Sequence, residues 1–405
     1  MTTMNHSEKW QNLKLDSVGV LFCGQSPSTK DVNSDGNGTT YITGPEQWDG
    51  NKIHQNKWTT NPKRIVPDGC IFITVKGSGV GKIFPGIAGA IGRDIYAFKP
   101  SEEHSAKYIE YALKFTVQDI LKNAVGDIPG ISKGHILGHE VLVPTLEQQK
   151  CIVAKIEELF SHIDAGIEAL KKAKQLLKQY RQSVLKAAVN GELTKEWREK
   201  NSISQESWKD STIGEIASVK TGKTPKRSSA EFWENGTIPW LTSSVTNEVF
   251  THQAEQFVTQ AAVDEGLKLF EPGTLLLAMY GEGKTRGQVT EITFQATCNQ
   301  ACAAIIVDEN KASRAFVRLH LHENYEETRK AASGGNQPNL NLSKVRDITL
   351  PLPILAEQDE IVVRVEQEFE AIERLEKDIE AQLLKTEKNK QSILVSAFSG
   401  DLTHE

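Results

Sequence analysis

QSVLKAAVNGELT, at residues 182–194, returns as QSILVSAFSGDLT at residues 391–403, and seven of the thirteen positions are identical. The same spacing of 209 relates further pairs: Gly126 and Gly335, Pro129 and Pro338, Pro144 and Pro353, and Ile152-Val153 and Ile361-Val362. Near the start the spacing is 198, and it pairs Trp10 with Trp208, Gly24 with Gly222, and Pro27 with Pro225. Matches at constant spacing predict one structural unit built twice, with eleven more residues in the second copy.

Each copy opens with a part rich in Gly, Pro, Thr and Asn, at residues 1–145 and 202–354. Short apolar runs such as CIFITV (70–75) and TLLLAMY (274–280) interrupt these parts. Runs of this length between turn-forming residues are typical of strands joined by loops. We therefore expect two globular α/β domains.

Each copy closes with a segment that favours one long helix, at about 146–190 and 355–398. After its opening residues it contains no Pro and, in the first copy, one Gly, Gly166. Gly191 and Gly400 follow, and glycine commonly ends a helix. At 1.5 Å per residue, roughly forty residues make a rod of about 60 Å, which is longer than a small domain needs. A spacer or a partner-binding surface is the better interpretation than a helix that only covers a core.

Apolar residues recur every seven positions along both segments, which indicates a coiled coil. In the first segment the two core positions are Ile156, Ile163, Leu170, Leu177 and Val184, and Ile152, Leu159, Gly166, Ala173 and Tyr180. In the second they are Val365, Ile372, Ile379, Thr386 and Ile393, and the more polar Ile361, Glu368, Leu375, Gln382 and Asn389.

Charge predicts how the two helices pair. Residues 147–168 carry −3 (two Lys, five acids) and 169–189 carry +6 (six basic, no acid), whereas 357–380 carry −7 (three basic, ten acids) and 381–398 carry +2 (three Lys, one Glu). Only an antiparallel pair sets basic blocks against acidic ones. The expected fold is therefore α+β: two α/β domains separated by two long antiparallel helices, with an approximate internal twofold repeat.

Composition limits the remaining classes. The formal charge is −6, which argues against a protein that coats DNA by bulk electrostatics. The first residues lack the basic and apolar regions of a signal peptide, and no apolar run is long enough for a membrane span, so we expect a cytoplasmic protein with no membrane partner. The five cysteines include no Cys-x-x-Cys pair, and we expect Cys298 and Cys302 to be buried thiols rather than metal ligands.

Motifs for catalysis are absent. GEGKT (281–285) has Ala278 where a phosphate-binding loop needs its first Gly, and GVGKI (79–83) lacks the Ser or Thr that binds magnesium. Pro67-Asp68 followed by Thr74-Val75-Lys76 has Thr74 where a metal-dependent nuclease needs its second carboxylate. The chain also lacks the Asn-Pro-Pro-aromatic and Asp-Pro-Pro-aromatic tetrapeptides of amino-methyltransferases. We therefore expect neither an enzyme nor a cofactor or metal site in this chain.

Three repeated features resemble the specificity subunits of type I restriction-modification enzymes. They are a Pro-x-Leu-x-x-Gln element before each helix (144–149 and 353–358), the helix endings quoted above, and a Trp followed by GQSP or GKTP. The resemblance covers the whole chain. It implies target recognition domains at 1–145 and 202–354, each reading half of a bipartite asymmetric site, with a central helical spacer at 146–201 and a distal one at 355–405.

The resemblance also implies the partners: double-stranded DNA, two modification (methyltransferase) subunits, and restriction subunits. Those subunits, not this chain, would use S-adenosylmethionine, ATP and magnesium. The alternative from another class is a coiled-coil scaffold that bridges proteins without reading DNA. That alternative gives no reason for two globular domains with the same frame and different loops.

Base reading requires Arg, Lys, Asn or Gln side chains on loops that can enter a groove. In the first domain the candidates lie on GQSPSTK, NKWTTNPKR and VKGSGVGK: Gln25, Ser28, Lys30, Lys57, Lys63, Arg64, Lys76, Ser78 and Lys82. In the second they lie on GKTPKRSS, YGEGKTRG, CNQ and GGNQPN: Lys223, Thr224, Lys226, Arg227, Tyr280, Lys284, Arg286, Asn299, Gln300, Asn336, Gln337 and Asn339. The first domain carries +1 and the second −3, so both must rely on local patches and on partners to hold phosphate.

Overall fold

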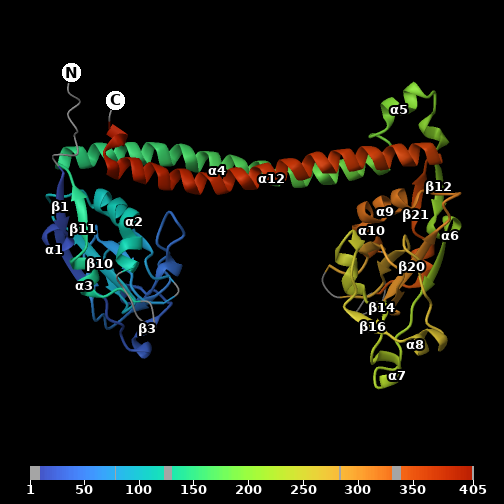
Figure 1. Cartoon of the computed structure of the whole chain (residues 1–405), viewed down its shortest axis with the longest axis horizontal. Helices are drawn as coiled ribbons and strands as arrows, with labels where there is room; N and C mark the ends of the chain where they lie inside the picture. The colour runs from blue at the N-terminus through green and yellow to red at the C-terminus, as the bar shows by residue number, and fades with distance from the viewer. Residues whose placement is uncertain (1–9, 78, 123–129, 282–283, 331–338, 404–405) are drawn as a thin grey trace. The chain divides into compact units, whose positions relative to one another are not determined.

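The computed structural model describes residues 10–77, 79–122, 130–281, 284–330 and 339–403. The chain forms two compact units, residues 1–171 with 380–405 and residues 172–379. Each unit contains one globular part and part of each of two long helices, α4 (Leu146–Val189) and α12 (Leu355–Ser399) (Figure 1). None of the helices in the described ranges combines the length and the apolarity needed to cross a lipid bilayer.

Three sheets build the globular part of the first unit. Its strands are β1 (Gln11–Lys14), β2 (Gly19–Cys23), β3 (Val32–Asn33), β4 (Thr39–Ile42), β5 (Trp58–Thr59), β6 (Ile65–Val66), β7 (Ile71–Thr74), β8 (Ile83–Pro85), β9 (Gly89–Ile91), β10 (Ile95–Pro100) and β11 (Glu140–Val143). The sheet orders are β1-β11, β2-β10-β7-β8 and β3-β5-β4-β9-β6. Its helices are α1 (Leu15–Val18), α2 (Ala106–Lys122) and α3 (Lys133–Leu137).

The second unit repeats this plan. Its strands are β12 (Lys209–Thr212), β13 (Ala217–Thr221), β14 (Ile238–Leu241), β15 (Phe250–Thr251), β16 (Gln256–Val258), β17 (Leu275–Ala278), β18 (Val289–Ile292), β19 (Thr297–Cys298), β20 (Cys302–Val307) and β21 (Thr349–Leu352). Its helices are α5 (Lys195–Lys200), α6 (Ile213–Ile216), α7 (Ala230–Trp233), α8 (Gln260–Asp264), α9 (Arg314–Glu323), α10 (Tyr325–Lys330) and α11 (Leu342–Arg346). The sheet orders are β12-β21, β13-β20-β17-β18-β15 and β16-β14-β19.

The predicted internal repeat is confirmed by the strand orders. The order β2-β10-β7-β8 in the first unit corresponds to β13-β20-β17-β18 in the second, and the pair β1-β11 corresponds to β12-β21. The apolar runs at 70–75 and 274–280 form the buried strands β7 and β17, as expected. The pairs Gly126 and Pro129, and Gly335 and Pro338, lie outside the described residues.

The core of each globular part continues onto the long helices. In the first unit Tyr108 of α2 packs with Ile156 of α4 and Phe398 of α12. In the second unit Phe316 of α9 belongs to one cluster with Val184 of α4 and with Ile361 and Val365 of α12. Each domain is therefore fixed to its stretch of the helices by buried apolar contacts, which are the main favourable term in folding.

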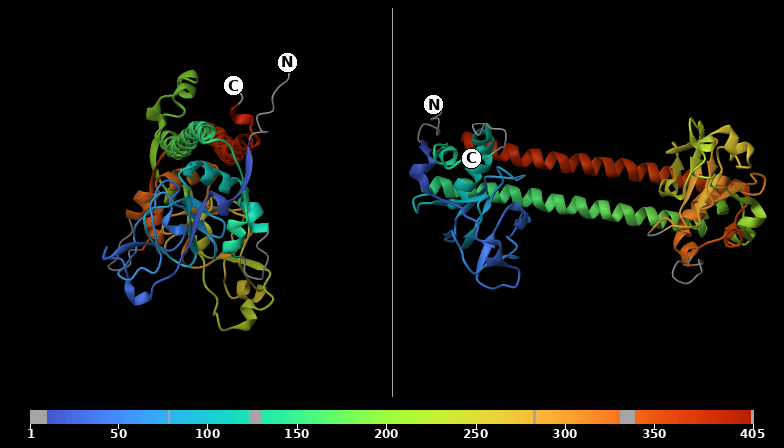
Figure 2. Two further views of the ribbon diagram at one scale, coloured as in Figure 1. Left: turned by 90° about the vertical axis from the view of Figure 1, so that its left-hand side faces the viewer. Right: turned by 90° about the horizontal axis from the view of Figure 1, so that it is seen from below.

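The two helices run antiparallel within each unit, as charge predicted (Figures 1 and 2). In the first unit Asp164 of α4 accepts a 2.5 Å bond from Lys390 of α12, and nearer the start of α4 Ile156 clusters with Phe398. In the second, Tyr180 donates to Glu368 at 3.0 Å, and just beyond the end of α4 Leu193 O accepts from Arg364 at 3.0 Å. Residue numbers therefore rise along one helix as they fall along the other.

The heptad pattern is confirmed at one position of each helix and fails at the other on α12. Residues 156, 163, 170, 177 and 184 are buried or half-buried, and so are 365, 372, 379, 386 and 393. At the second position of α12, however, Leu375, Gln382 and Asn389 are exposed. The neighbouring row of α12 is half-buried in their place: Val362, Phe369, Glu376, Leu383 and Lys390.

Both helices end as predicted. Gly191 and Gly400 have φ of +83° and +89°, in the left-handed region where a side chain would be strained. The helix bounds of 146–189 and 355–399 lie within one residue of the expected ones.

The repeated Pro-x-Leu-x-x-Gln element has one structural role in both units. Gln149 is buried, donates from Nε2 to Pro144 O at 2.9 Å and accepts at Oε1 from Ser105 N at 2.8 Å. Gln358 donates to Pro353 O at 2.7 Å and accepts from Ser313 N at 2.7 Å. Each glutamine therefore ties the start of a long helix to the start of the helix that covers the sheet, α2 or α9.

Candidate nucleic-acid interface

The GQSP loop of the first domain lies flat against the turn between β9 and β10. The backbone N–H groups of Gly24 and Gln25 donate to Ile95 O and Ile91 O, both at 3.1 Å. A Cβ atom added to Gly24 would lie 2.0 Å from Gly92 O. Only glycine allows this close approach, and it leaves Gln25 and Ser28 exposed on the outer side of the loop.

The structure brings this loop to the second candidate loop, residues 56–64. Asp31 accepts from Thr60 N at its backbone oxygen and from Asn61 Nδ2 at its carboxylate, both at 3.0 Å. Arg64 Nε donates to Cys23 O at 3.1 Å. As a result Gln25, Ser28 and Lys30 share one end of the domain with Lys57, Lys63 and Arg64.

Lys57 lies on a hollow of about 520 Å³ between these loops. Its Nζ donates to Thr43 Oγ1 at 3.0 Å. Arg93, Asp94 and Tyr41 also line the hollow, and sequence reasoning missed all three. Arg93 follows the glycine that the GQSP loop crosses, but nothing in the local sequence marks that turn as part of the same surface.

Two further candidates of the first domain lie on the turn between β7 and β8. Lys76 follows Val75, whose N–H bonds to Asp94 O at 2.9 Å, so the base of this turn adjoins the hollow. Lys82 follows Gly81, which lies beside Leu121 of α2. Neither lysine lines the hollow, and Ser78 lies outside the described residues.

The GKTP loop of the second domain is anchored in the same way. Lys223 N–H donates to Cys298 O at 3.0 Å, and a Cβ atom on Gly222 would lie 1.7 Å from that oxygen. Thr224 Oγ1 donates to Gln300 Oε1 at 2.6 Å. The structure therefore joins two predicted loops, GKTPKRSS and CNQ, through their candidate side chains.

Two tryptophans that were not predicted hold the GKTP loop. The indole N–H groups of Trp240 and Trp233 donate to the carbonyls of Lys223 and Lys226, at 3.1 and 3.2 Å. The guanidinium of Arg227 lies over both rings, with its Cζ atom 4.0 Å from the centroid of Trp233 and 4.5 Å from that of Trp240, and the two rings are at 84° to each other. Two tryptophans within eight residues of an otherwise polar stretch were the available signal.

The remaining loops of the second domain gather beside this one. Met279 donates its N–H to Ala301 O at 2.8 Å and accepts from Leu340 N at 3.1 Å, which brings Tyr280, Asn299 and Asn339 to one end of the sheet. The carbonyls of Lys284 and Arg286 accept from Tyr325 Oη and Arg329 Nη1 of α10. Asn336 and Gln337 lie outside the described residues.

The side-chain oxygen of Asn299 already has a hydrogen-bond partner within the domain. Its Oδ1 accepts from Ala301 N at 3.0 Å and closes a turn. An asparagine reads adenine with its oxygen and nitrogen together, so this bond leaves Asn299 less able to do so.

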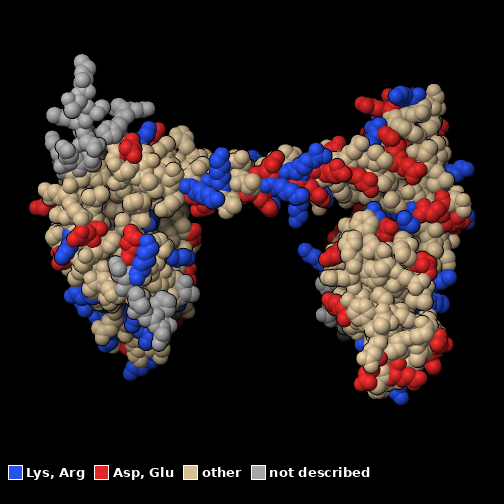
Figure 3. Space-filling view, viewed as in Figure 1, with Lys and Arg blue, Asp and Glu red and all other residues tan. Residues whose placement is uncertain are grey.

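Charge differs between the two loop surfaces. In the view of Figure 3, Lys and Arg gather over the lower end of the first unit, whereas Asp and Glu dominate the lower end of the second. The acids of α7 and its flank, Glu231 and Glu234, and of α8 and its flank, Asp264 and Glu265, are exposed there. DNA phosphate is expected to avoid these acids and to approach from the side of Lys223 and Lys226.

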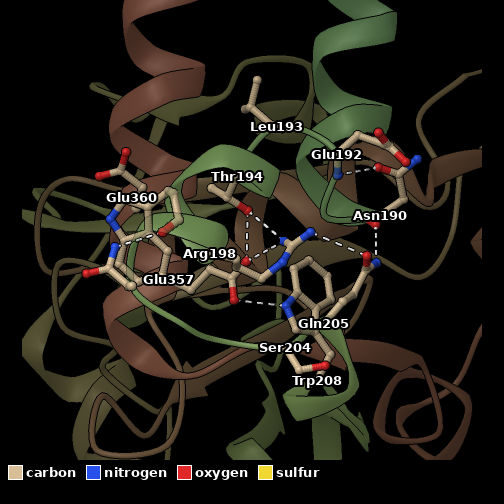
Figure 4. Close-up of polar contacts among 12 residues, drawn as sticks. Asn190, Glu192, Leu193, Thr194, Arg198, Ser204, Gln205, Trp208, Glu357 and Glu360 are labelled. Carbon is tan, nitrogen blue, oxygen red and sulfur yellow. Dashed lines mark hydrogen bonds and ion pairs between the residues drawn. The ribbon is translucent and has the colours of Figure 1, made fainter.

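A buried junction attaches the second domain to α12 (Figure 4). Arg198 Nη1 lies 2.6 Å from Glu357 Oε1, and the two side chains are 5% and 0% exposed. Thr194 Oγ1 donates to the same oxygen at 2.8 Å, and Trp208 Nε1 donates to Glu357 Oε2 at 2.9 Å. The segment between α4 and the second domain is thereby held to the first turn of α12.

Cys298 and Cys302 are buried thiols beneath the GKTP loop, as expected. A hydrogen bond that the Cys302 thiol donates to Cys298, together with burial, raises the pKa of Cys302 well above its ordinary value. Within the ranges that the structure describes, His, Cys, Asp and Glu side chains form no group of three or more that could hold a metal ion.

Comparison with known proteins supports the resemblance found in the sequence. The profile of the family described as type I restriction modification DNA specificity domain matches twice, at residues 7–178 and 205–385. The EcoDI specificity subunit of Escherichia coli is 29% identical over 322 residues, covering 73% of this chain and 70% of the relative. The StySPI specificity subunit of Salmonella potsdam is 27% identical over 320 residues, covering 76% and 68%.

Two solved structures have the same fold. A chain described under "Structural basis underlying complex assembly and conformational transition of the type I R-M system" aligns over 97% of this chain and 98% of its own, with a TM-score of 0.71 and 15% identity. The HsdS subunit from Thermoanaerobacter tengcongensis aligns over 97% of both chains, with a TM-score of 0.63 and 17% identity. At these identities the likeness concerns the fold alone.

Proposed function

Because this chain belongs to the type I restriction modification DNA specificity family, we propose that it reads a two-part, asymmetric DNA sequence, one part with each globular domain. Specificity subunits are the non-catalytic DNA-recognition component of type I restriction-modification systems. In this proposal residues 1–145 and 202–354 are the two target recognition domains. Residues 146–201 and 355–405 are the spacers that join them.

One observation carries the proposal. In each unit the candidate loops gather around the GQSP or the GKTP loop, and we call this group of loops the loop platform of that domain. The two loop platforms bear different side chains. Gly24 and Gly222 both pass directly over a backbone carbonyl, and the loops that follow them adjoin the other candidate loops. The exposed residues then differ, with Gln25 and Ser28 on one platform and Lys223 and Arg227 on the other. Two loops with the same backbone arrangement but different side chains are suited to reading two different half-sites.

The candidate residues have unequal roles in this proposal. Side chains that lie on the loop platforms are placed to meet base edges, and lysines at their margins, such as Lys63 and Lys226, are placed to meet phosphates. Because the domains carry only +1 and −3, neither holds DNA strongly by itself. The isolated chain should therefore bind DNA weakly, and the complex with its partners should bind it well.

The helices are the proposed attachment site for partners. Each unit presents one antiparallel pair of helices together with one domain, so two equivalent surfaces are available for two modification subunits. Restriction subunits would join the same complex. S-adenosylmethionine, ATP and magnesium would be bound by those subunits, and the complex would act in the cytoplasm, where the DNA is.

Methylation sequencing tests the proposal. The chain is expressed with its modification subunit in a host without other methyltransferases, and every modified position in the genome is determined. We expect one motif with two defined parts and an undefined gap between them, and no methyl transfer by the purified chain alone. A stable complex that methylates without a two-part motif would favour the protein-bridging scaffold instead.

A further inference from the structure

Arg227, at the end of the GKTPKR loop, is held by contacts with two tryptophans and one glutamine. Trp233 and Trp240 hold this loop twice: their indole N–H groups bind its backbone, and their rings hold the guanidinium of Arg227. Gln256 of β16 also holds the guanidinium, because its Oε1 atom accepts from Arg227 Nη1 at 2.6 Å. The side chain is nevertheless exposed to solvent.

This arrangement differs from that of an arginine that only supports the fold. A guanidinium has five N–H donors, and only the bond to Gln256 uses one of them among the described residues. The Nε–Nη2 edge keeps its donors free for a ligand. Because the two rings are at 84° to each other, the guanidinium can be parallel to only one of them, but contact with an aromatic ring uses none of its N–H donors.

The neighbouring candidate residues have fewer hydrogen-bonding atoms left for a base. The Oε1 atom of Gln300 accepts from Thr224, and the Oδ1 atom of Asn299 accepts from Ala301. An amide that reads adenine needs its oxygen as well as its nitrogen, so both residues lose part of the required pattern. Arg227 keeps both N–H donors of its Nε–Nη2 edge, which are the ones that a base contact needs.

We infer that Arg227 is a specificity-determining residue that reads a guanine in the half-site of the second domain. An arginine edge donates two parallel hydrogen bonds to O6 and N7 of guanine, and no other base offers two acceptors side by side in the major groove. The tryptophans hold the guanidinium of Arg227 in place before DNA binds, so little side-chain entropy is lost on binding. The inference rests on the proposed DNA-reading function and adds the residue and the base.

The test uses the full chain in complex with its modification subunit and three variants: Arg227→Ala, Arg227→Lys and, as the matched control on the same loop, Lys226→Ala. Co-purification and thermal melting first establish that each complex is intact. Genomic methylation sequencing then reports the motif of each. Exchange of residues 202–354 for those of a relative identifies which half-site belongs to this domain.

We expect the parent motif to contain guanine on one strand of that half-site. Arg227→Ala and Arg227→Lys should both relax that single position, with discrimination against other bases falling roughly tenfold to a hundredfold, because one bidentate contact is lost. The other half-site should be unchanged. Lys226→Ala should lower methylation at all sites without relaxing any position.

Several results would overturn the inference. They are an unchanged motif in both variants, a half-site without guanine, or loss of all methylation in both variants of an intact complex. If Arg227→Ala alone abolishes methylation, the Arg227→Lys complex decides the question. A relaxed position in its motif supports base reading. An unchanged parent motif shows that only the charge of residue 227 is needed. A parent complex with no two-part motif would instead refute the proposed function itself.

Discussion

Arg198 and Glu357 form a buried ion pair, 2.6 Å from Nη1 to Oε1, across 159 positions of sequence. Both carboxylate oxygens are occupied, because Thr194 donates to Oε1 and Trp208 donates to Oε2. Trp208 is the first match of the second copy, and Glu357 stands in the first turn of α12. The pair therefore joins the segment that precedes the second domain to the first turn of the long helix.

Replacing Arg198 by Ala should destabilise the second unit by about 3–5 kcal/mol, because Glu357 would remain buried without its counter-charge. The double variant Arg198→Met with Glu357→Leu should recover part of that loss, since it removes both charges but leaves Thr194 and Trp208 without their acceptor. Urea unfolding followed by tryptophan fluorescence measures both. Equal stability of the single and double variants would contradict the account of this junction.

The buried glutamines predict a matched pair of effects. Gln149→Leu and Gln358→Leu should each cost about 1–3 kcal/mol, because a backbone N–H and a prolyl carbonyl lose their partner in a buried place. Gln175→Leu, at an exposed position of α4, is the control and should leave the unfolding midpoint nearly unchanged. A loss for only one of the two glutamines would show that the repeated element has different roles in the two units.

Reversing charge along α4 should weaken its pairing with α12. A variant with Glu in place of Lys171, Lys172, Lys174 and Lys178 should melt at a lower temperature than one with Glu in place of four exposed lysines elsewhere: Lys52, Lys195, Lys209 and Lys268. High salt should shrink the difference, since it screens exposed charges. Equal melting of the two variants at low salt would count against charge as the cause of the antiparallel pairing.

His322 makes the second unit sensitive to acid. Burial, followed by the nearby charge of Arg318, lowers the pKa of His322 from 6.5 to about 4. The unfolded chain therefore binds more protons than the folded one between these values, so stability present above pH 6.5 is lost as pH falls toward 4. His322→Gln should flatten that part of the stability curve relative to the parent. Parallel curves for parent and variant would rule out this histidine as the source.

The fold was readable from the sequence where periodicity and repetition are strong. Both long helices, their terminal glycines and their antiparallel order follow from heptads, Gly191 and Gly400, and charge blocks. One row of the α12 seam was predicted wrongly: constant spacing from the first helix places Leu375, Gln382 and Asn389 in the seam, but these residues are exposed.

The candidate interface was predictable only as separate loops. Contacts such as Thr224 with Gln300 and Asn61 with Asp31 join residues far apart in sequence, and no local pattern reports them. Trp233 and Trp240 were not among the predicted residues, because the sequence does not show that their rings lie against Arg227. Arg93 was missed because it stands beside the loops in space and not in sequence.

The central claim is that the two domains read DNA independently, and exchange of one domain tests it most directly. Residues 202–354 are replaced by the equivalent domain of a relative with a known, different motif, and the genome methylated by the hybrid complex is sequenced. The account predicts that one half of the motif changes to that of the relative, while the other half stays as in the parent. A change in both halves, or in neither, would contradict it.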